Sequence, residues 1–326
     1  MLDTLRLYQR GRNNLEFELN EKMFKSHCDE EKKPDILYKN FLNDEGKQSI
    51  YVMNNLKRDF VTIEFSVPKL LYGNSLQNVK QEDTERIKGI LEKRLKGKFE
   101  ADYMNMQISR LDVTQNMNVE NEIPIYIHAL NNAYSRDKRY RVEKYSDETL
   151  EIKNNSRKFT MYDKVKEAID NKDITRREAK QYGNILRFEV KHNKARDIKT
   201  SFNKVYTLED ILKDSFFETA KMFQVKAFDK MFCNSGNYEM FMEDIAMIHV
   251  VKDYNKRNVL KNFALKDMTD KTGYKHDFEH YEDLLKHTGM TRDGIRKALK
   301  DFNRLLLLNK TKSSDIIEEI RSKLVA

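Results

Sequence analysis

The chain has 326 residues, of which 35% are charged and 39% hydrophobic, and its net charge is +8. A chain of this length can bury a substantial core and is expected to divide into two domains. Two cysteines outside any CxxC pair argue against a disulfide framework or a thiolate zinc site. The N-terminus lacks a signal-peptide core and no apolar run could span a bilayer, so we expect a cytoplasmic protein without a membrane partner. The basic balance favours a polyanionic partner such as nucleic acid.

Strand and helix patterns alternate through residues 1–200. Alternating β-branched and aromatic residues predict a strand over 59–71, and an apolar stripe at helical spacing predicts a helix over 79–99. Further strands are predicted over 106–117, 139–146, 149–164 (with a tight turn at 154–156) and 184–193, and further helices over 123–135 and 175–183, the last closed by Gly183. This order predicts an α+β domain over 1–200, with a mainly antiparallel sheet and flanking helices.

Strand patterns end near residue 202, and a helical stripe that Thr207 caps begins an all-helical domain over 201–326. We expect the boundary between the domains near 195–206. Around Gly289, two short apolar stripes have the layout of a helix-turn-helix, although a packed αα-hairpin explains them equally well. The basic residues on the exposed face of its second helix are candidate DNA contacts: Arg292, Arg296, Lys297 and Lys300.

Four of the predicted strands carry ionisable groups on one face and apolar groups on the other. The polar faces carry, in chain order, Glu64; Arg110 and Asp112; Tyr162 and Lys164; and Arg187, Glu189 and Lys191. The solvated face of a half-buried sheet explains any one of these strands alone. If the strands pair, however, the carboxylates converge near Tyr162, where they suit a hard cation such as Mg²⁺ or Mn²⁺. A tyrosine oxygen there could attack phosphorus, with Lys164 lowering its pKa or holding a phosphate.

The segments VTIEFS, SRLDVTQNM, SRKFTMYDKVKE and LRFEVKHN follow one another within about Phe60 to Asn193. In this order they resemble rolling-circle replication initiators of the staphylococcal plasmid type and of the filamentous-phage gene II type. The resemblance implies a replication-initiator/relaxase-like sheet, related to HUH nucleases. It also implies a metal-dependent endonuclease that nicks one strand of a double-stranded origin. The implied nucleophile is Tyr162, which would leave a 5′-phosphotyrosine and a 3′-OH primer. The implied Mg²⁺ or Mn²⁺ ligands are Asp112 and Glu189, with Glu64 a further candidate.

The implied partner is origin DNA, both double-stranded and single-stranded at the nick site, in the cytoplasm of a bacterial host. A host helicase or polymerase and a second copy of the chain are further candidate partners. Within the sheet, Arg110, Arg187 and Lys191 are candidate DNA contacts, although the two arginines could instead pair with neighbouring carboxylates.

The resemblance leaves alternatives open. The plasmid group usually has an acidic residue where this chain has Asn116, which favours the phage-type branch and keeps open a non-catalytic DNA-binding regulator. A mobilisation relaxase would use the same chemistry as an initiator. No His-hydrophobic-His triplet occurs, so a histidine metal site is not expected. His192, at the end of its strand, could contribute a metal ligand, but we expect it to be an exposed strand-end histidine.

Overall fold

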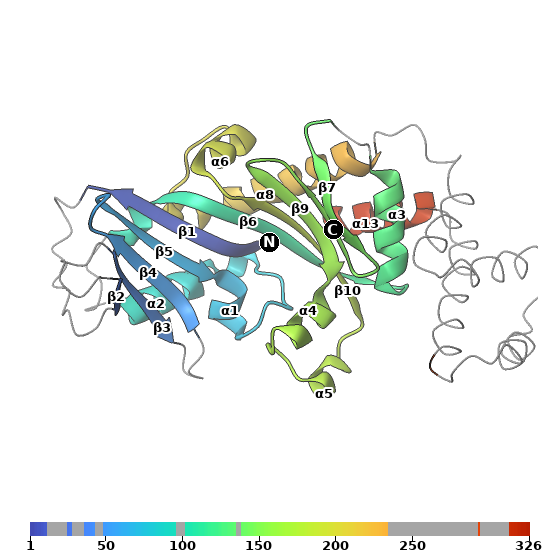
Figure 1. Ribbon diagram of the computed structural model, residues 1–326, viewed down its shortest axis with the longest axis horizontal. Helices are drawn as coiled ribbons and strands as arrows, with labels where there is room; N and C mark the ends of the chain where they lie inside the picture. The colour runs from blue at the N-terminus through green and yellow to red at the C-terminus, as the bar shows by residue number, and fades with distance from the viewer. Residues whose placement is uncertain are drawn as a thin grey trace, which may run out of the picture.

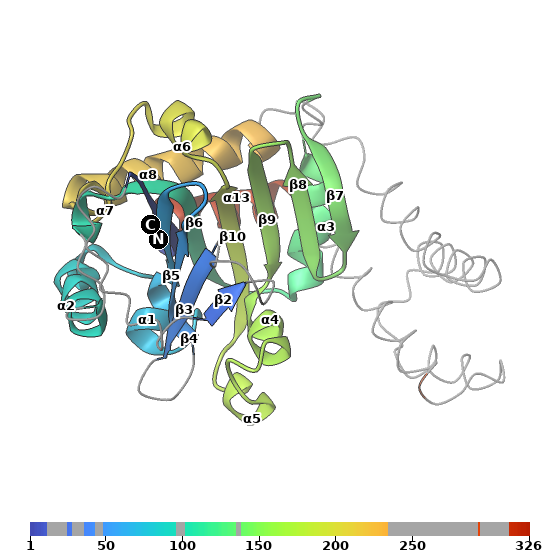
Figure 2. The ribbon, with the colours of Figure 1, turned by 60° about the vertical axis from the view of Figure 1, so that its left-hand side comes forward.

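The computed structural model describes residues 1–11, 25–27, 36–42, 48–95, 102–134, 138–233, 293 and 313–326. Its strands are β1 (Leu2–Arg10), β2 (Lys25–His27), β3 (Ile36–Leu42), β4 (Gln48–Asn55), β5 (Phe60–Ser66), β6 (Gln107–Val119), β7 (Arg141–Ser146), β8 (Thr149–Lys153), β9 (Arg157–Asp163) and β10 (Asn184–His192). They form one 10-stranded sheet in the order β2-β3-β4-β5-β1-β6-β10-β9-β8-β7 (Figures 1 and 2). Every described pair of neighbours is antiparallel, which confirms the predicted α+β class.

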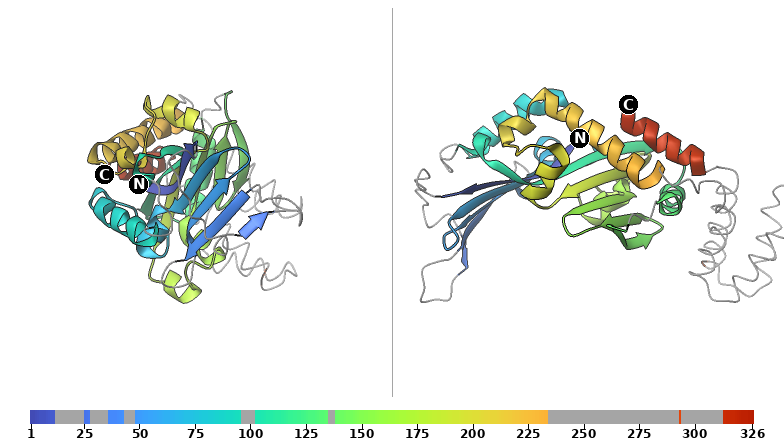
Figure 3. Two further views of the ribbon diagram at one scale, coloured as in Figure 1. Left: turned by 90° about the vertical axis from the view of Figure 1, so that its left-hand side faces the viewer. Right: turned by 90° about the horizontal axis from the view of Figure 1, so that it is seen from above.

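Helices pack on the sheet and at its edge. They are α1 (Val67–Tyr72), α2 (Thr84–Leu95), α3 (Ile123–Ala133), α4 (Lys164–Asp170), α5 (Arg176–Ala179), α6 (Ala195–Phe202), α7 (Leu208–Ile211), α8 (Asp214–Phe228) and α13 (Ser313–Val325), with 3₁₀ turns at Gln81–Asp83 and Tyr103–Asn105 and a π-helical segment at Asp229–Cys233. Seen from above, α8 and α13 run along one side of the sheet (Figure 3). None of the helices in the described ranges combines the length and apolar character needed to cross a bilayer.

Two large hydrophobic cores lie between the sheet and the helices, and a small third cluster of Leu76, Ala168, Ile174 and Ile185 lies beside α4. In the first, the alternating apolar residues of β1, β5 and β6 pack with α2, α6, α7 and the start of α8; in the second, those of β8, β9 and β10 pack with α3, α13 and the end of α8. Ile63, Leu111 and Phe188 are each 0% exposed, and burying such a side chain stabilises the fold by roughly 1.5–3 kcal/mol. Because strand side chains alternate, the residues between these apolar positions face the other side of the sheet.

The N-terminal strand β1 lies between β5 and β6 at the centre of the sheet, where no strand was predicted. Leu5 and Leu7 are buried and alternate with partly exposed Arg6 and Tyr8, as expected of a strand. A register shift against β6 near the start of β1 breaks this alternation, because Leu2 and the neighbouring Asp3 are both buried. The short alternating stretch that remains explains why the pattern was missed.

The strand predicted over 59–71 ends earlier, at Ser66, and α1 follows directly. Pro68 lies in the first turn of α1, where the missing N–H of proline costs nothing, and it could not have donated to a sheet ladder. Gly73 ends α1 in the left-handed conformation with φ 76°, which favours glycine. A proline inside an apolar run was therefore the signal for the strand end.

The strand that carries Tyr162 also ends earlier than predicted. Asp163 caps α4 by accepting a hydrogen bond from the Lys166 backbone N–H at 3.0 Å, so Lys164 begins a helix instead of continuing the strand. The helix predicted over 175–183 is a single turn, α5, that ends at Ala179. Gly183 therefore does not close it.

Two predicted local signals are confirmed. In the turn between β8 and β9, Asn154 Oδ1 accepts hydrogen bonds from the backbone N–H groups of Ser156 at 2.9 Å and Arg157 at 2.8 Å. Thr207 caps α7, with Asp210 completing a capping box.

The division into two domains stays a prediction, because residues 234–292 and 294–312 lie outside the described residues. The same holds for the helix-turn-helix and its four basic residues at 292, 296, 297 and 300.

Candidate active site

A hollow of about 640 Å³ lies on the polar face of the sheet, opposite the helix-covered cores. Its lining includes residues of β1, β4, β5, β6, β9 and β10, and the start of α4 closes one side. Six predicted site residues line it: Glu64, Asp112, Tyr162, Lys164, Glu189 and Lys191. The strand order brings these segments together although they are up to 127 positions apart in sequence, as Glu64 and Lys191 are.

Tyr162 is half-buried and lies directly opposite Arg187 in the β9–β10 register. Its hydroxyl lies 3.5 Å from Glu189 Oε2, a long hydrogen bond in which the phenol donates. Burial raises the pKa of Tyr162 well above its usual value; Glu189, Glu167 and Asp3 raise it further, and the Arg187 charge opposes them. The hydroxyl therefore keeps its proton at neutral pH in the free protein.

Lys164 lies under the tyrosine ring and not at its hydroxyl. Its ammonium is 5.8 Å from the centroid of the Tyr162 ring and forms an ion pair with Glu167. The residue is 1% exposed, and burial together with the Arg187 charge lowers the pKa of Lys164, which the Glu167 carboxylate partly offsets. In this arrangement Lys164 supports the ring and is already engaged by Glu167.

Asp112 and Glu189 are two buried carboxylates that lie close enough to influence each other. Asp112 is 0% exposed and accepts two hydrogen bonds from Arg110, from Nε at 3.1 Å and from Nη2 at 2.6 Å. Burial raises the pKa of Asp112 to about 7, against the Arg110 hydrogen bonds, and the Glu189 charge raises it further. Glu189 is 3% exposed, and Lys191 Nζ lies 3.4 Å from its Oε2. The negative charges of Asp112 and Glu189 repel each other, and a cation between the two carboxylates would relieve that repulsion.

A magnesium ion fits this pair, since Mg²⁺ is commonly bound through one or two carboxylates and keeps several waters. The described ranges contain no group of three or more His, Cys, Asp or Glu side chains placed to hold a metal together. Asp112 and Glu189 would therefore share the ion with water or with DNA oxygens.

Compared with Asp112, whose two oxygens both accept from Arg110 alone, Glu64 is held by two arginines. One of its oxygens accepts from Arg6 Nε at 2.6 Å and the other accepts from Arg110 Nη1 at 2.9 Å. Through Arg110, Glu64 is connected to Asp112, so its observed contacts hold the arginine that orients this aspartate. Arg110 is thus paired with carboxylates, the second of the two roles expected for it.

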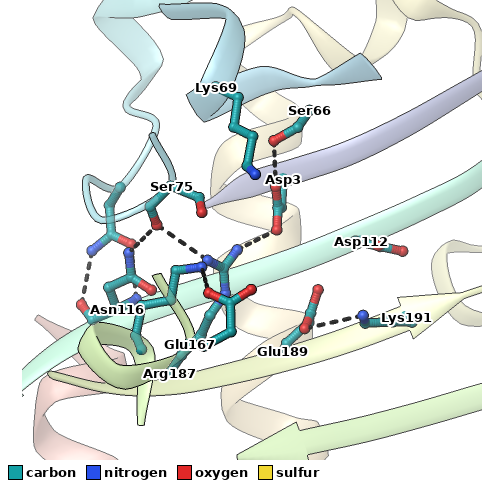
Figure 4. A network of polar contacts seen from close by, with 12 residues as sticks. Asp3, Ser66, Lys69, Ser75, Asp112, Asn116, Glu167, Arg187, Glu189 and Lys191 are labelled. Carbon is teal, nitrogen blue, oxygen red and sulfur yellow. Dashed lines mark hydrogen bonds and ion pairs between the residues drawn. The ribbon is translucent and has the colours of Figure 1, made fainter. Parts of the chain in front are cut away.

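Arg187 is a buried anchor of the site. It is 1% exposed, forms an ion pair with Asp3, and donates to the Ser75 carbonyl at 3.2 Å (Figure 4). Asp3 in turn accepts from the Ser66 hydroxyl at 2.9 Å. The guanidinium of Arg187 is enclosed by protein, which argues against the predicted direct DNA contact, and its partner is Asp3 instead of a neighbouring carboxylate of the predicted strands. Asp3 was missed because β1 was not recognised as a strand.

The side chain of Asn116 explains why an amide suits a position that is acidic in the plasmid group. Its NH₂ donates to the carbonyls of Ser75 at 3.0 Å and Leu76 at 2.9 Å. A carboxylate would face these two oxygens without a proton to donate. Asn116 thus fastens the segment after α1, whose Ser75 lines the hollow.

His192 is buried and not exposed as expected. It is 0% exposed, its Nδ1 lies 3.3 Å from the Leu111 carbonyl, and its Nε2 lies 3.1 Å from Ser201 Oγ. Its ring packs beside Phe202 and Phe223, which belong to the helix-covered side. Burial lowers the pKa of His192 to about 4, so the ring is neutral and structural.

Comparison with protein families gives one match. A family profile for the N-terminal part of the phage gene II replication-associated protein covers residues 37–210, slightly more than half of the chain. The matched segment includes Glu64, Asp112, Tyr162 and Glu189. No curated protein matches the sequence.

Proposed function

The chain belongs to the gene II family of replication-associated proteins, which are rolling-circle replication initiators, and from this premise we propose that it nicks one strand of its origin DNA through Tyr162. The observation that carries the proposal is the position of the Tyr162 hydroxyl, beside Glu189 in a polar hollow that Asp112 also lines. The nicking reaction would leave a primer end for rolling-circle synthesis and keep the other end on the protein.

The proposed step is a transesterification. The Tyr162 oxygen attacks the phosphorus of one phosphodiester, a new O–P bond forms, and the bond from phosphorus to the 3′ oxygen breaks. The phenolic proton passes to Glu189, the acceptor that the hydroxyl contacts, and the leaving 3′ oxygen takes a proton from solvent to become the 3′-OH. Since the pKa of Tyr162 is raised in the free protein, the proton must leave as the O–P bond forms.

Asp112 and Glu189 would hold Mg²⁺ or Mn²⁺, with Arg110 orienting Asp112. When bound, the ion would polarise the phosphodiester and stabilise charge on its oxygens. Lys164 would fix the plane of the tyrosine ring, and Lys191, which is 27% exposed at its side chain, remains a candidate phosphate contact.

The test is incubation of the protein with supercoiled origin DNA and Mg²⁺ or Mn²⁺, followed by denaturing electrophoresis. We expect relaxed circles linked covalently to the protein, and we expect Tyr162→Phe to form none of them. Tyr145→Phe, on the edge strand β7, is the matched control and should nick like the wild type. Covalent circles formed by Tyr162→Phe would show that another residue is the nucleophile.

A further inference from the structure

A second hollow, of about 320 Å³, adjoins the first on the side of β8 and β9. The two hollows share Tyr162, Glu167, Glu189 and Lys191 in their linings, so the tyrosine stands between them. Ligand pockets in proteins start at roughly 300 Å³, a size suited to a single nucleotide. A DNA strand attacked by Tyr162 must continue on both sides of the reacting phosphate, and a hollow is present on each side.

Thr160 gives the second hollow an unused polar group. It lines this hollow, is 5% exposed, and lies two residues before Tyr162 on the same face of β9. Its hydroxyl is buried without a hydrogen-bond partner among the described residues. Such a group costs stability unless something pairs with it, so its presence beside the tyrosine points to a ligand.

Next to Thr160, three lysines lie in register across neighbouring strands. Lys158 of β9 is opposite Lys153 of β8 on one side and Lys191 of β10 on the other. Strands are spaced about 4.8 Å apart, so the row crosses three strands at regular intervals. Of the three lysines Lys191 lines the hollow itself, whose lining also contains Lys144, Lys166 and six carboxylates (Glu148, Glu151, Asp163, Glu167, Asp170 and Glu189). Each side chain is partly exposed, at 31%, 27% and 27% for Lys153, Lys158 and Lys191, and each pairs with a glutamate. Lysines arranged in such a row can contact successive phosphates of a DNA strand.

We propose that the second hollow holds the nucleotide next to the phosphodiester that Tyr162 attacks, with the Thr160 hydroxyl as its hydrogen-bond partner. The row of Lys153, Lys158 and Lys191 carries the backbone of the strand as it leaves the site toward β8. This inference rests on the proposed nicking function, and it assigns the side of the tyrosine over which the single strand runs.

The experiment measures binding and not cleavage, in the Tyr162→Phe protein, so that DNA stays intact. The probe is a short fluorescent single-stranded oligonucleotide of mixed sequence, titrated by anisotropy at several salt concentrations. Thr160→Val keeps the shape of the side chain and removes only the hydroxyl. We expect it to weaken DNA binding, raising Kd by about three- to tenfold, the effect of one lost hydrogen bond. The melting temperature should not fall, because the hydroxyl that is removed has no partner among the described residues.

Thr62→Val is the matched control, since Thr62 is a buried threonine, 6% exposed, on β5, four positions away from β9 in the sheet. It should leave Kd unchanged. Equal Kd values for Thr160→Val and its parent, a loss that Thr62→Val reproduces, or a loss explained by a lower melting temperature would each overturn the proposal. Absence of any binding by the parent would overturn it as well.

The lysine row has its own readout. Lys158→Gln should reduce the slope of log Kd against log salt by about 0.7, the value for one phosphate contact with a single strand. Lys88→Gln, on α2 and paired with Glu85 at 2.6 Å, should not change the slope. Equal slopes for Lys158→Gln and its parent would overturn the backbone path.

Failure of this inference and failure of the proposed function are distinguishable. If Tyr162 forms no covalent product but Thr160→Val still weakens binding, the function is wrong and the nucleotide site stands. If Tyr162 forms the product and Thr160→Val binds normally, only the nucleotide site is wrong.

Discussion

Replacing Arg187 with methionine should strongly destabilise the fold. Arg187 and Asp3 form an ion pair across β6, between β10 and β1, with side chains only 1% and 12% exposed. The Arg187→Met variant leaves the Asp3 carboxylate buried without its counter-ion, while the Ser66 hydroxyl still donates to it. Removing one partner of a buried pair costs about 3–5 kcal/mol, because the other charge loses both water and its counter-ion.

A double-mutant cycle separates the cost of the unpaired Asp3 charge from the cost of the packing that is lost with the Arg187 side chain. In the Asp3→Asn, Arg187→Met double variant no charge is left unpaired at this position. Such a replacement of a whole buried pair is often neutral, so we expect the double variant to lose on the order of 1 kcal/mol. The double variant should therefore be more stable than Arg187→Met alone.

The assay is urea unfolding followed by circular dichroism, with the free energy of unfolding taken for the wild type, both single variants and the double variant. A loss below about 1 kcal/mol in Arg187→Met would refute the reasoning. Losses of the single variants that add up in the double variant would also refute it, since they would mean that the two residues do not interact.

Three further outcomes are expected. The pKa of His192 is about 4 in the folded protein and 6.5 in the unfolded chain, so the unfolded chain takes up the proton first as pH drops. The free energy of unfolding should therefore fall by up to about 3 kcal/mol between about pH 6.5 and pH 4. A free energy of unfolding for His192→Gln that falls as steeply as that of the wild type in this window would contradict this. Asp112→Asn should slow nicking by on the order of 100-fold or more, because Asp112 and Glu189 together form the candidate cation site. Glu64→Gln should slow it by about tenfold or less, because Glu64 is held between two arginines; equal losses in a gel assay would make Glu64 a ligand. Asn154→Ala should cost about 1 kcal/mol of unfolding free energy by removing the acceptor of the β8–β9 turn, and a change below about 0.3 kcal/mol would argue otherwise.

The strands that carry the candidate site could be predicted because their alternation is strong and local. In β6, β9 and β10 the apolar positions are buried, and Asp112, Tyr162, Glu189 and Lys191 line the hollow, as the sequence pattern indicated. The strand ends could not be predicted from alternation, because Pro68 and Asp163 begin helices inside runs that otherwise continue the strand pattern. Pro68 in the first turn of α1 and the Asp163 cap of α4 set the ends of these two strands.

The buried partners of the site depend on contacts that are distant in sequence. Asp3 and Arg187 are 184 positions apart, and only the insertion of β1 between β5 and β6 brings them together. Because β1 was not predicted, the sequence pattern indicated that Arg187 is an exposed cation next to Glu189. The burial of His192 has a more local origin, because α6 follows β10 and places Phe202 against the His192 ring.

The central claim is that Tyr162 is the residue joined to DNA, and peptide mapping of the covalent complex tests it most directly. Trypsin cleaves after Lys158 and Lys164, so Tyr162 lies in the peptide spanning residues 159–164, which contains no other tyrosine. After incubation with origin DNA and Mg²⁺, nuclease trimming and tryptic digestion, we predict that mass spectrometry finds a nucleotide phosphate on this peptide. A nucleotide phosphate on a different peptide, with 159–164 unmodified, would contradict the account.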